Sequence, residues 1–185
     1  MYKHMAVLFC LACLLACSTQ KLDTRGREVR YAKGYVAPNF SGTDQGGRPF
    51  ELWRQWGKKV ILNFSTTYNG RSLLLIPEFK AFYQQVNKEE VALLSVFVKQ
   101  KEGTVIPFAR QNVINYPVIA DAYGAIGKLY GIQIRLQEDA FEQYSTTDYT
   151  EMQFPLTLFI DEEGVIRRIL TTDVKAKELQ EFVAE

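Results

Sequence analysis

Cysteine and histidine, the residue types that most often carry redox or nucleophilic chemistry, are confined to the first 17 positions of this chain. The three cysteines are Cys10, Cys13 and Cys17, and the single histidine is His4. Beyond Cys17 there is no thiolate to attack a disulfide and no imidazole for a Ser-His-Asp triad. A structural zinc site lacks its Cys or His ligands there as well. Acid or base catalysis in the rest of the chain must use Asp, Glu, Lys or Tyr.

A polar loop is the main candidate site, and it reads Asn63-Phe-Ser-Thr-Thr-Tyr-Asn-Gly-Arg-Ser72. It follows an apolar strand and leads into a predicted helix, whose unpaired N–H groups and Arg71 favour an anion. Asn69 and Gly70 are either an anchor for a ligand or a turn, because Asn-Gly tolerates left-handed backbone. Ser72 is either a nucleophile, which requires a base that the sequence does not identify, or an ordinary early-helix residue.

The N-terminus has the features of a secretion signal. Lys3 precedes an apolar run that is too short to span a bilayer, for which roughly 20 residues are needed. The run ends in Leu14-Leu-Ala-Cys17, which resembles the bacterial lipobox, in which the cysteine is lipidated. The alternatives are an ordinary signal peptide or a misassigned start. We predict a signal peptide over residues 1–16, a lipid on Cys17, a tether over 17–34 and one domain over 35–185.

This processing would leave a mature protein without a free thiol and without net charge. The chain has 22 Lys plus Arg and 21 Asp plus Glu, and removal of Lys3 makes the two equal. This balance gives no electrostatic case for nucleic acid or an anionic membrane surface as a partner. We expect an envelope protein held by its lipid anchor, and the outer membrane is favoured because Ser18 is not an inner-membrane retention signal of the Asp type.

Hydrophobic patterning predicts an α/β domain with a parallel or mixed central sheet. A hairpin is expected around the turn at 44–47, and a second one around the turn at 161–164. The predicted strands are 36–40, 48–52, 60–64, 91–98, 116–120, 156–160 and 165–170. The predicted helices are 71–87, 102–112, 122–130 and 175–184. Proline is expected to kink the first helix at Pro77 and to interrupt the second near Pro107.

Residues 132–152 form an irregular, acidic and tyrosine-bearing stretch with two interpretations. It is either a recognition surface or a loop folded over its own domain. Its acidic cluster, Glu138, Asp139 and Glu142, is either a cation site or simply solvated.

Four segments, taken in order, resemble the thioredoxin-like superfamily. The nearest branch is the redoxins: membrane-tethered thiol-disulfide oxidoreductases and peroxiredoxins of the alkyl hydroperoxide reductase type. The segments are Val36-Ala-Pro-Asn-Phe40 with Asp44-Gln-Gly-Gly-Arg48, then 58–68, 119–131 and Phe154-Pro-Leu-Thr-Leu-Phe-Ile-Asp-Glu-Glu-Gly164. The resemblance implies a three-layer α/β fold: a central mixed sheet with an N-terminal β-hairpin and helices on both faces.

The resemblance also implies where a site would lie. The attacking and resolving cysteines of the family fall on Asn69 and Ser72, and the family's cis-proline falls on Pro155. The backbone beside that proline pairs with an extended peptide in the family. The expected binding residues are therefore Tyr68, Asn69, Gly70, Arg71, Phe154 and Pro155.

Neither an amide nor a hydroxyl can form a disulfide with a substrate, so these replacements argue against redox catalysis. From the residues we expect no catalytic residue, no cofactor and no metal. The expected function is a non-catalytic lipoprotein that binds a peptide or an envelope protein through the cis-proline face. The alternative is the activity that the resemblance implies, a thiol-disulfide oxidoreductase or peroxiredoxin-type antioxidant, alone or shared with a cysteine-bearing partner.

Overall fold

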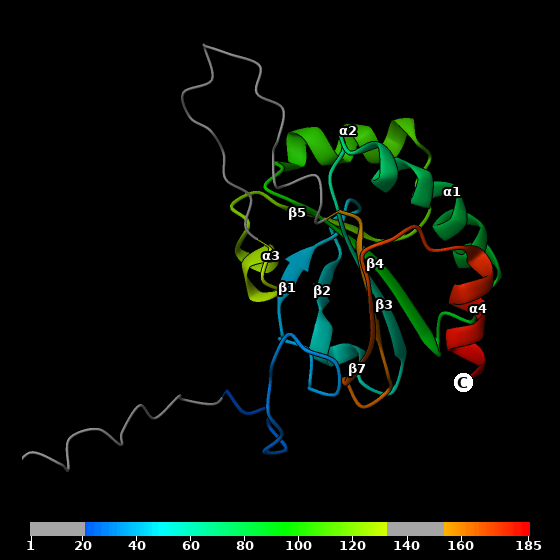
Figure 1. The fold of residues 1–185 in the computed structure, drawn as a ribbon. Helices are drawn as coiled ribbons and strands as arrows, with labels where there is room; N and C mark the ends of the chain where they lie inside the picture. Colours follow the sequence, from blue (N-terminus) through cyan, green and yellow to red (C-terminus); the bar gives the residue numbers. More distant parts are fainter. Residues whose placement is uncertain (1–20, 133–153) are drawn as a thin grey trace, which may run out of the picture.

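A computed structural model describes residues 21–132 and 154–185, which form an α/β fold around a mixed sheet (Figure 1). The strands are β1 (Ser41–Thr43), β2 (Pro49–Glu51), β3 (Lys59–Ser65), β4 (Val91–Val98), β5 (Val118–Asp121), β6 (Leu156–Ile160) and β7 (Ile166–Leu170). The helices are the 3-10 turn η1 (Leu52–Gln55), α1 (Gly70–Gln85), α2 (Glu102–Gln111), α3 (Ala125–Leu129) and α4 (Ala176–Ala184).

The central sheet has the strand order β5-β4-β3-β6-β7. Strands β3, β4 and β5 are parallel, whereas β6 runs antiparallel to β3 and β7 antiparallel to β6. The middle strands β3 and β4 are buried along almost their whole length, as expected for apolar strands covered on both faces. Strands β1 and β2 form a separate antiparallel hairpin.

Two apolar layers sandwich the central sheet. Helices α1, α2 and α4 pack on one face through side chains such as Phe79, Val105 and Phe182. The β1–β2 hairpin and α3 cover the other face, where Phe40 and Ile126 join the core. This is the predicted thioredoxin-like arrangement, and the predicted fold class is confirmed.

Local differences from the predicted elements have backbone causes. The predicted strand over 36–40 is wrong, since β1 lies at Ser41–Thr43 and Val36 makes only isolated bridges to Val29 and Val165. The predicted break near Pro107 is also wrong, because α2 continues through it. Helix α3 starts later than predicted, because Gly124 before it has a left-handed backbone with φ of 71°.

Several sequence expectations fall on residues outside the described part of the chain. They are the signal peptide, Cys17, most of the predicted insert over 132–152 and its acidic cluster. Within residues 21–132 and 154–185, no helix combines the length and apolar character needed to cross a bilayer.

Candidate functional site

The loop between β3 and α1 ends in a helix cap. Asn69 is the N-cap of α1, and its side-chain oxygen accepts a hydrogen bond of 3.0 Å from the Ser72 N–H. Asn and Ser are favoured at such helix starts, because their side chains bond N–H groups that have no partner within the helix. Asn69 has an extended backbone, with φ of −84° and ψ of 117°, so it caps the helix and does not form the left-handed turn that Asn-Gly allows. Because the Ser72 N–H is engaged, the expected preference of this helix end for an anion is weakened.

Two hydroxyl groups are buried at the same loop. Thr66 is fully buried and Ser72 is 2% exposed, and neither hydroxyl oxygen has a hydrogen-bond partner in the described part of the chain. An activated serine needs a base within hydrogen-bond reach of its Oγ. The geometry of Ser72 therefore supports its role as an early-helix residue and gives no support to a nucleophile.

The loop is held in place by a glutamine from the neighbouring strand end. The Gln100 side chain follows β4, accepts from the Thr67 N–H at 3.0 Å and donates to the Thr67 hydroxyl at 2.6 Å. Gln100 is buried and Thr67 is half-buried, so both bonds are partly shielded from water. The sequence analysis did not identify Gln100, because no local pattern predicts that this polar side chain is buried.

A polar link also crosses the sheet beneath the loop. The Asn63 amide of β3 donates to the Thr157 hydroxyl of β6 at 3.0 Å, and Ser95 of β4 donates to the Asn63 oxygen at 3.3 Å. Burial raises the pKa of the Tyr116 phenol well above its usual value, and a hydrogen bond with Ser95 offsets part of this rise. Sequence reasoning missed this link, although a polar residue inside the apolar run 60–64 was a visible signal.

The cis-proline segment lies directly beside the loop. The peptide bond between Phe154 and Pro155 is cis, the isomer that the resemblance predicts. Leu156 pairs with Phe64, which places Pro155 one residue beyond the last pair of the β3–β6 ladder, next to the end of β3. The structure therefore brings the loop and the proline together, as expected.

The six expected binding residues divide by exposure. Tyr68 is 64% exposed, and Gly70 and Arg71 are also exposed. Asn69, Phe154 and Pro155 are buried. The exposed members form the accessible surface of the site, and the buried members support it.

An open groove runs along α1 from the residue after Ser72. It has a volume of about 380 Å³ and is lined by Leu73, Ile76, Pro77, Lys80, Ala81, Gln84 and Asn112. Leu74 beside it is 63% exposed. The loop is therefore flanked by exposed apolar side chains of the kind that contact other proteins.

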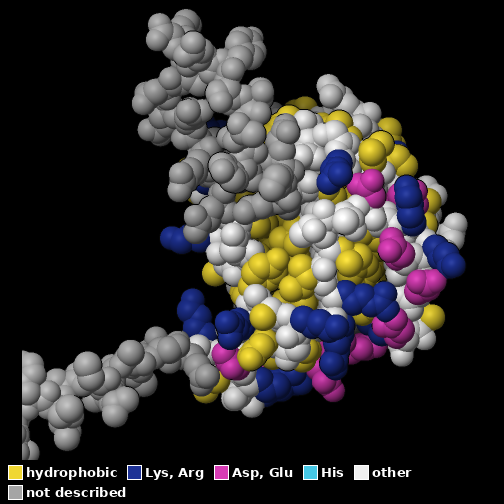
Figure 2. All heavy atoms as spheres, in the orientation of Figure 1, with side chains coloured by type: hydrophobic (Ala, Val, Ile, Leu, Met, Phe, Trp, Pro, Cys, Tyr) yellow, Lys and Arg dark blue, Asp and Glu magenta, His cyan; other side chains and the backbone are white. Residues whose placement is uncertain are grey.

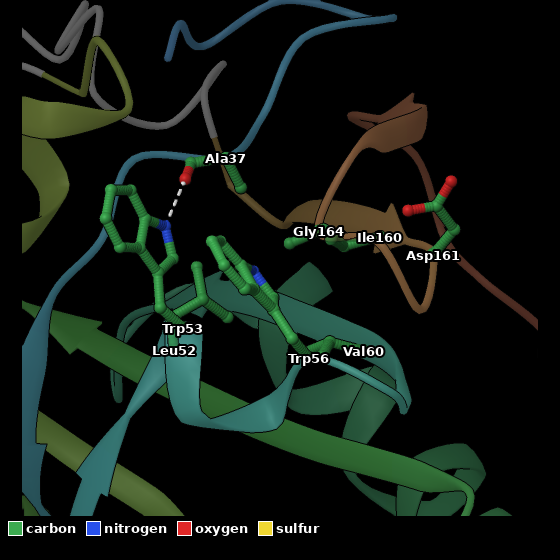
Figure 3. Close-up of a pocket in the computed structure, with 8 residues that line it drawn as sticks. All are labelled: Ala37, Leu52, Trp53, Trp56, Val60, Ile160, Asp161 and Gly164. Atoms are coloured by element: carbon green, nitrogen blue, oxygen red, sulfur yellow. Dashed lines mark hydrogen bonds between the residues drawn. The ribbon is translucent and has the colours of Figure 1, made fainter. Parts of the chain in front are cut away.

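A second pocket, at the opposite end of β3, is filled by two tryptophans (Figure 3). The Trp53 and Trp56 rings lie 5.3 Å apart, and the Trp53 N–H donates to the Ala37 carbonyl at 3.0 Å. Trp56 points toward Gly164 in the turn between β6 and β7. The indoles leave no room for a water molecule, so this pocket is a packing feature.

No described residue supplies thiol, metal or imidazole chemistry. Among residues 21–132 and 154–185, no group of three His, Cys, Asp or Glu side chains is placed to hold a metal ion. The motif positions hold an amide and a hydroxyl. The site consists of a fixed loop, a cis-proline beside it, and the exposed residues Tyr68, Gly70, Arg71 and Leu74 around them.

Sequence comparison finds relatives that are named as a thiol-disulfide oxidoreductase and as a thioredoxin-like protein. The chain is 24% identical over 157 residues to the thiol-disulfide oxidoreductase ResA of Bacillus thuringiensis subsp. konkukian, covering 85% of this chain and 80% of that protein. It is 26% identical over 158 residues to the thioredoxin-like protein YneN of Bacillus subtilis, covering 84% and 81%.

Solved structures share the fold. A putative thiol:disulfide interchange protein DsbE from Chlorobium tepidum superposes with a TM-score of 0.65 at 19% identity, covering 83% of this chain and 96% of the other. StoA from Bacillus subtilis gives 0.62 at 22% identity, covering 80% and 97%.

These relatives correct the functional expectation. A non-catalytic binding protein was expected because the two cysteine positions hold Asn69 and Ser72, but ResA is named a thiol-disulfide oxidoreductase and DsbE a putative thiol:disulfide interchange protein. They favour the alternative, and the earlier interpretation is wrong. Residues 34–169, most of the chain, match the AhpC/TSA family. The chain therefore belongs to the AhpC/TSA family, within the thioredoxin-like redoxins.

Proposed function

We propose that this protein acts in thiol-disulfide exchange outside the cytoplasm, the class of reaction that the names of several relatives state. The observation that carries the proposal is the placement of the β3–α1 loop beside the cis Phe154–Pro155 bond. In this fold the backbone next to such a proline is suited to pair with an extended segment that carries the disulfide.

The reacting thiols come from a cysteine-bearing partner. This part of the proposal follows from Asn69 and Ser72 and from the predicted fate of the N-terminus: residues 1–16 are removed as a signal peptide, and Cys17 carries lipid. Mass spectrometry of the mature N-terminus tests this processing. A Cys17→Ser variant should move the protein from the membrane fraction to the soluble fraction.

The exchange balances without any covalent change in this chain. A thiolate of the partner attacks one sulfur of the substrate disulfide, the S–S bond breaks, and a mixed disulfide forms. The second partner thiolate then attacks the partner's sulfur and releases the substrate as a dithiol, which takes up two protons. Two electrons pass from the partner dithiol to the substrate. This chain holds the substrate segment at the exposed part of the loop, which the buried Pro155 supports, and contacts the partner through the exposed side chain of Leu74.

The test is the thiol state of envelope proteins in the source organism, read by a thiol-reactive label. Deletion of the gene should raise the oxidised fraction, and the wild-type chain should restore it. A Pro155→Thr variant should fail to restore it, whereas Pro107→Ala on the exposed face of α2 should succeed. An unchanged thiol state in the deletion strain would contradict the proposed function.

A second arm uses the purified full-length chain with insulin or peroxide as substrate. No turnover is expected from the chain alone. If the chain alone reduces insulin and loses this activity on replacement of Cys10, Cys13 and Cys17 by Ser, the thiols are its own. That result would support thiol-disulfide exchange as the reaction but would contradict the proposal that a partner supplies the thiols.

A further inference from the structure

The near-neutral net charge of the chain conceals a local concentration of positive charge. Residues 21–35, named here the basic segment, contain five basic and two acidic residues, whereas the whole chain has a formal net charge of +1. The basic members are Lys21, Arg25, Arg27, Arg30 and Lys33. The near-zero net charge of the whole chain therefore does not apply to residues 21–35, which carry an excess of positive charge.

Most of these cations are not neutralised by neighbouring acids. Arg27 pairs with the buried Asp23 at 2.7 Å. The other four basic residues are exposed and form no ion pair among residues 21–132 and 154–185. Lys and Arg side chains are visible along the lower edge of Figure 2, near the point where the N-terminal trace leaves the body. The basic segment thus offers exposed positive charge to a partner.

Contacts with the rest of the domain fix these charges in position. The Arg25 guanidinium lies 4.7 Å from the centre of the Trp56 ring, and that of Arg30 lies 5.5 Å from the Tyr35 ring. The Gly34 N–H donates to the Ile166 carbonyl of β7 at 2.8 Å. Charged side chains that are already ordered lose little conformational freedom when they bind a partner. They therefore bind it more tightly than the same side chains on an unstructured segment.

The position of the basic segment in the chain brings it close to a membrane. Lys21 follows Cys17, the end of the apolar N-terminal run, by four residues. Four extended residues reach at most about 14 Å. Leu22, 57% exposed, adds an apolar side chain at the same place. A lipid on Cys17, or insertion of the apolar run itself, would hold the basic segment at the level of the headgroups.

We propose that the basic segment is a docking surface for anionic phospholipid headgroups. Charge complementarity and the short connection to the apolar run favour a bilayer over nucleic acid, the other common polyanion. The surface lies away from the β3–α1 loop and is independent of the proposed exchange reaction. It also revises the expectation, drawn from net charge, that anionic membranes are not a partner.

The test measures partition of the full-length protein onto vesicles of phosphatidylcholine alone and onto vesicles that also contain phosphatidylglycerol. The apolar N-terminus contributes to both, so the ratio of the two partition coefficients isolates the charge effect. Each basic residue near an anionic surface contributes about 1 kcal/mol, a factor of about five in that ratio. Removing three should lower the ratio on the order of a hundredfold. The triple variant is Arg25→Gln, Arg30→Gln and Lys33→Gln.

A matched control removes the same number of exposed cations elsewhere on the domain. It carries Lys101→Gln, Arg110→Gln and Lys128→Gln, all exposed positions near or in α2 and α3. The proposal expects this control to keep the preference for anionic vesicles, and expects added salt to abolish the preference. Equal loss in both triple variants, or no preference in the wild type, would overturn it. Tighter binding of the wild type to duplex DNA than to anionic vesicles would also overturn it.

Discussion

Cysteines at Asn69 and Ser72 should form a working disulfide site, because the two residues lie three apart at the first turn of α1, where side chains with this spacing are neighbours. The two residues are joined by the 3.0 Å cap hydrogen bond, and the Ser72 Oγ has no partner in the described residues that a thiol would displace. A thiolate at the N-terminus of α1 would also be stabilised, which lowers its pKa. The Asn69→Cys/Ser72→Cys variant should therefore reduce insulin when a small dithiol supplies electrons, whereas each single variant should not.

The stability change can be estimated from the same geometry. Closing a four-residue loop stabilises the folded state by about 2 kcal/mol at 25 °C. Loss of the Asn69 cap costs about 1 kcal/mol in both redox states. The oxidised variant should therefore melt roughly 4–8 °C above its reduced form and slightly above the wild type.

Differential scanning calorimetry with and without reductant measures this difference, and a thiol titration confirms the bond. Replacing Cys10, Cys13 and Cys17 by Ser in every variant removes other thiols. An Asn69→Ala control should lose about 1 kcal/mol and show no redox dependence. If oxidant leaves two free thiols in the double variant, or both forms melt together, our account of the loop is refuted.

Two further predictions concern stability. Gly164→Ala should cost at least about 3 kcal/mol, because a Cβ there would lie 2.9 Å from Cδ1 of the Trp56 ring and closer to its nitrogen, at a φ of +83°. Gly26→Ala, with a φ of +76° and no atom within 4 Å, should cost only about 1 kcal/mol, and urea unfolding followed by tryptophan emission compares the two. Burial alone would raise the Asp44 pKa, but hydrogen bonds from the Arg48 and Gly46 N–H groups and the Arg48 guanidinium bring the pKa below its usual value. Its stabilisation is then present above about pH 4 and lost as the pH falls through the lowered pKa, so Asp44→Asn should destabilise by about 1–2 kcal/mol at pH 7 and much less at pH 2 in urea titrations.

The sequence predicted the centre of the sheet well, because β3, β4 and β6 are apolar runs that are buried along almost their whole length. The hairpin strand was misplaced because Val36 has the pattern of a strand residue but is used in isolated bridges to Val29 and Val165. Pro107 was given too much weight. It occupies the sixth position of α2, where its missing N–H removes the bond to the Gly103 carbonyl but does not end the helix.

The candidate site was only partly predictable. Asn69 and Pro155 were found because a motif places them, and the structure sets Pro155 beside the end of β3, from which the loop with Asn69 starts. Asn63 was visible as a polar residue inside an apolar run but its role was not recognised, and Gln100 was not found because its importance depends on which strand ends lie side by side. Such neighbours are set by the sheet order, which local patterning does not encode.

Strand β3 separates the two ends of the molecule that we have assigned to different partners. Trp56, under Arg25, lies just before its first residue, and the loop with Asn69 follows its last. Seven residues of strand span about 23 Å. A protein that rests on the bilayer through its basic segment, with β3 along the membrane normal, would therefore hold the β3–α1 loop roughly that far above the lipid. In this position the β3–α1 loop would meet soluble partners and membrane proteins whose domains extend at least as far from the bilayer. It would not meet disulfides that lie at the membrane surface.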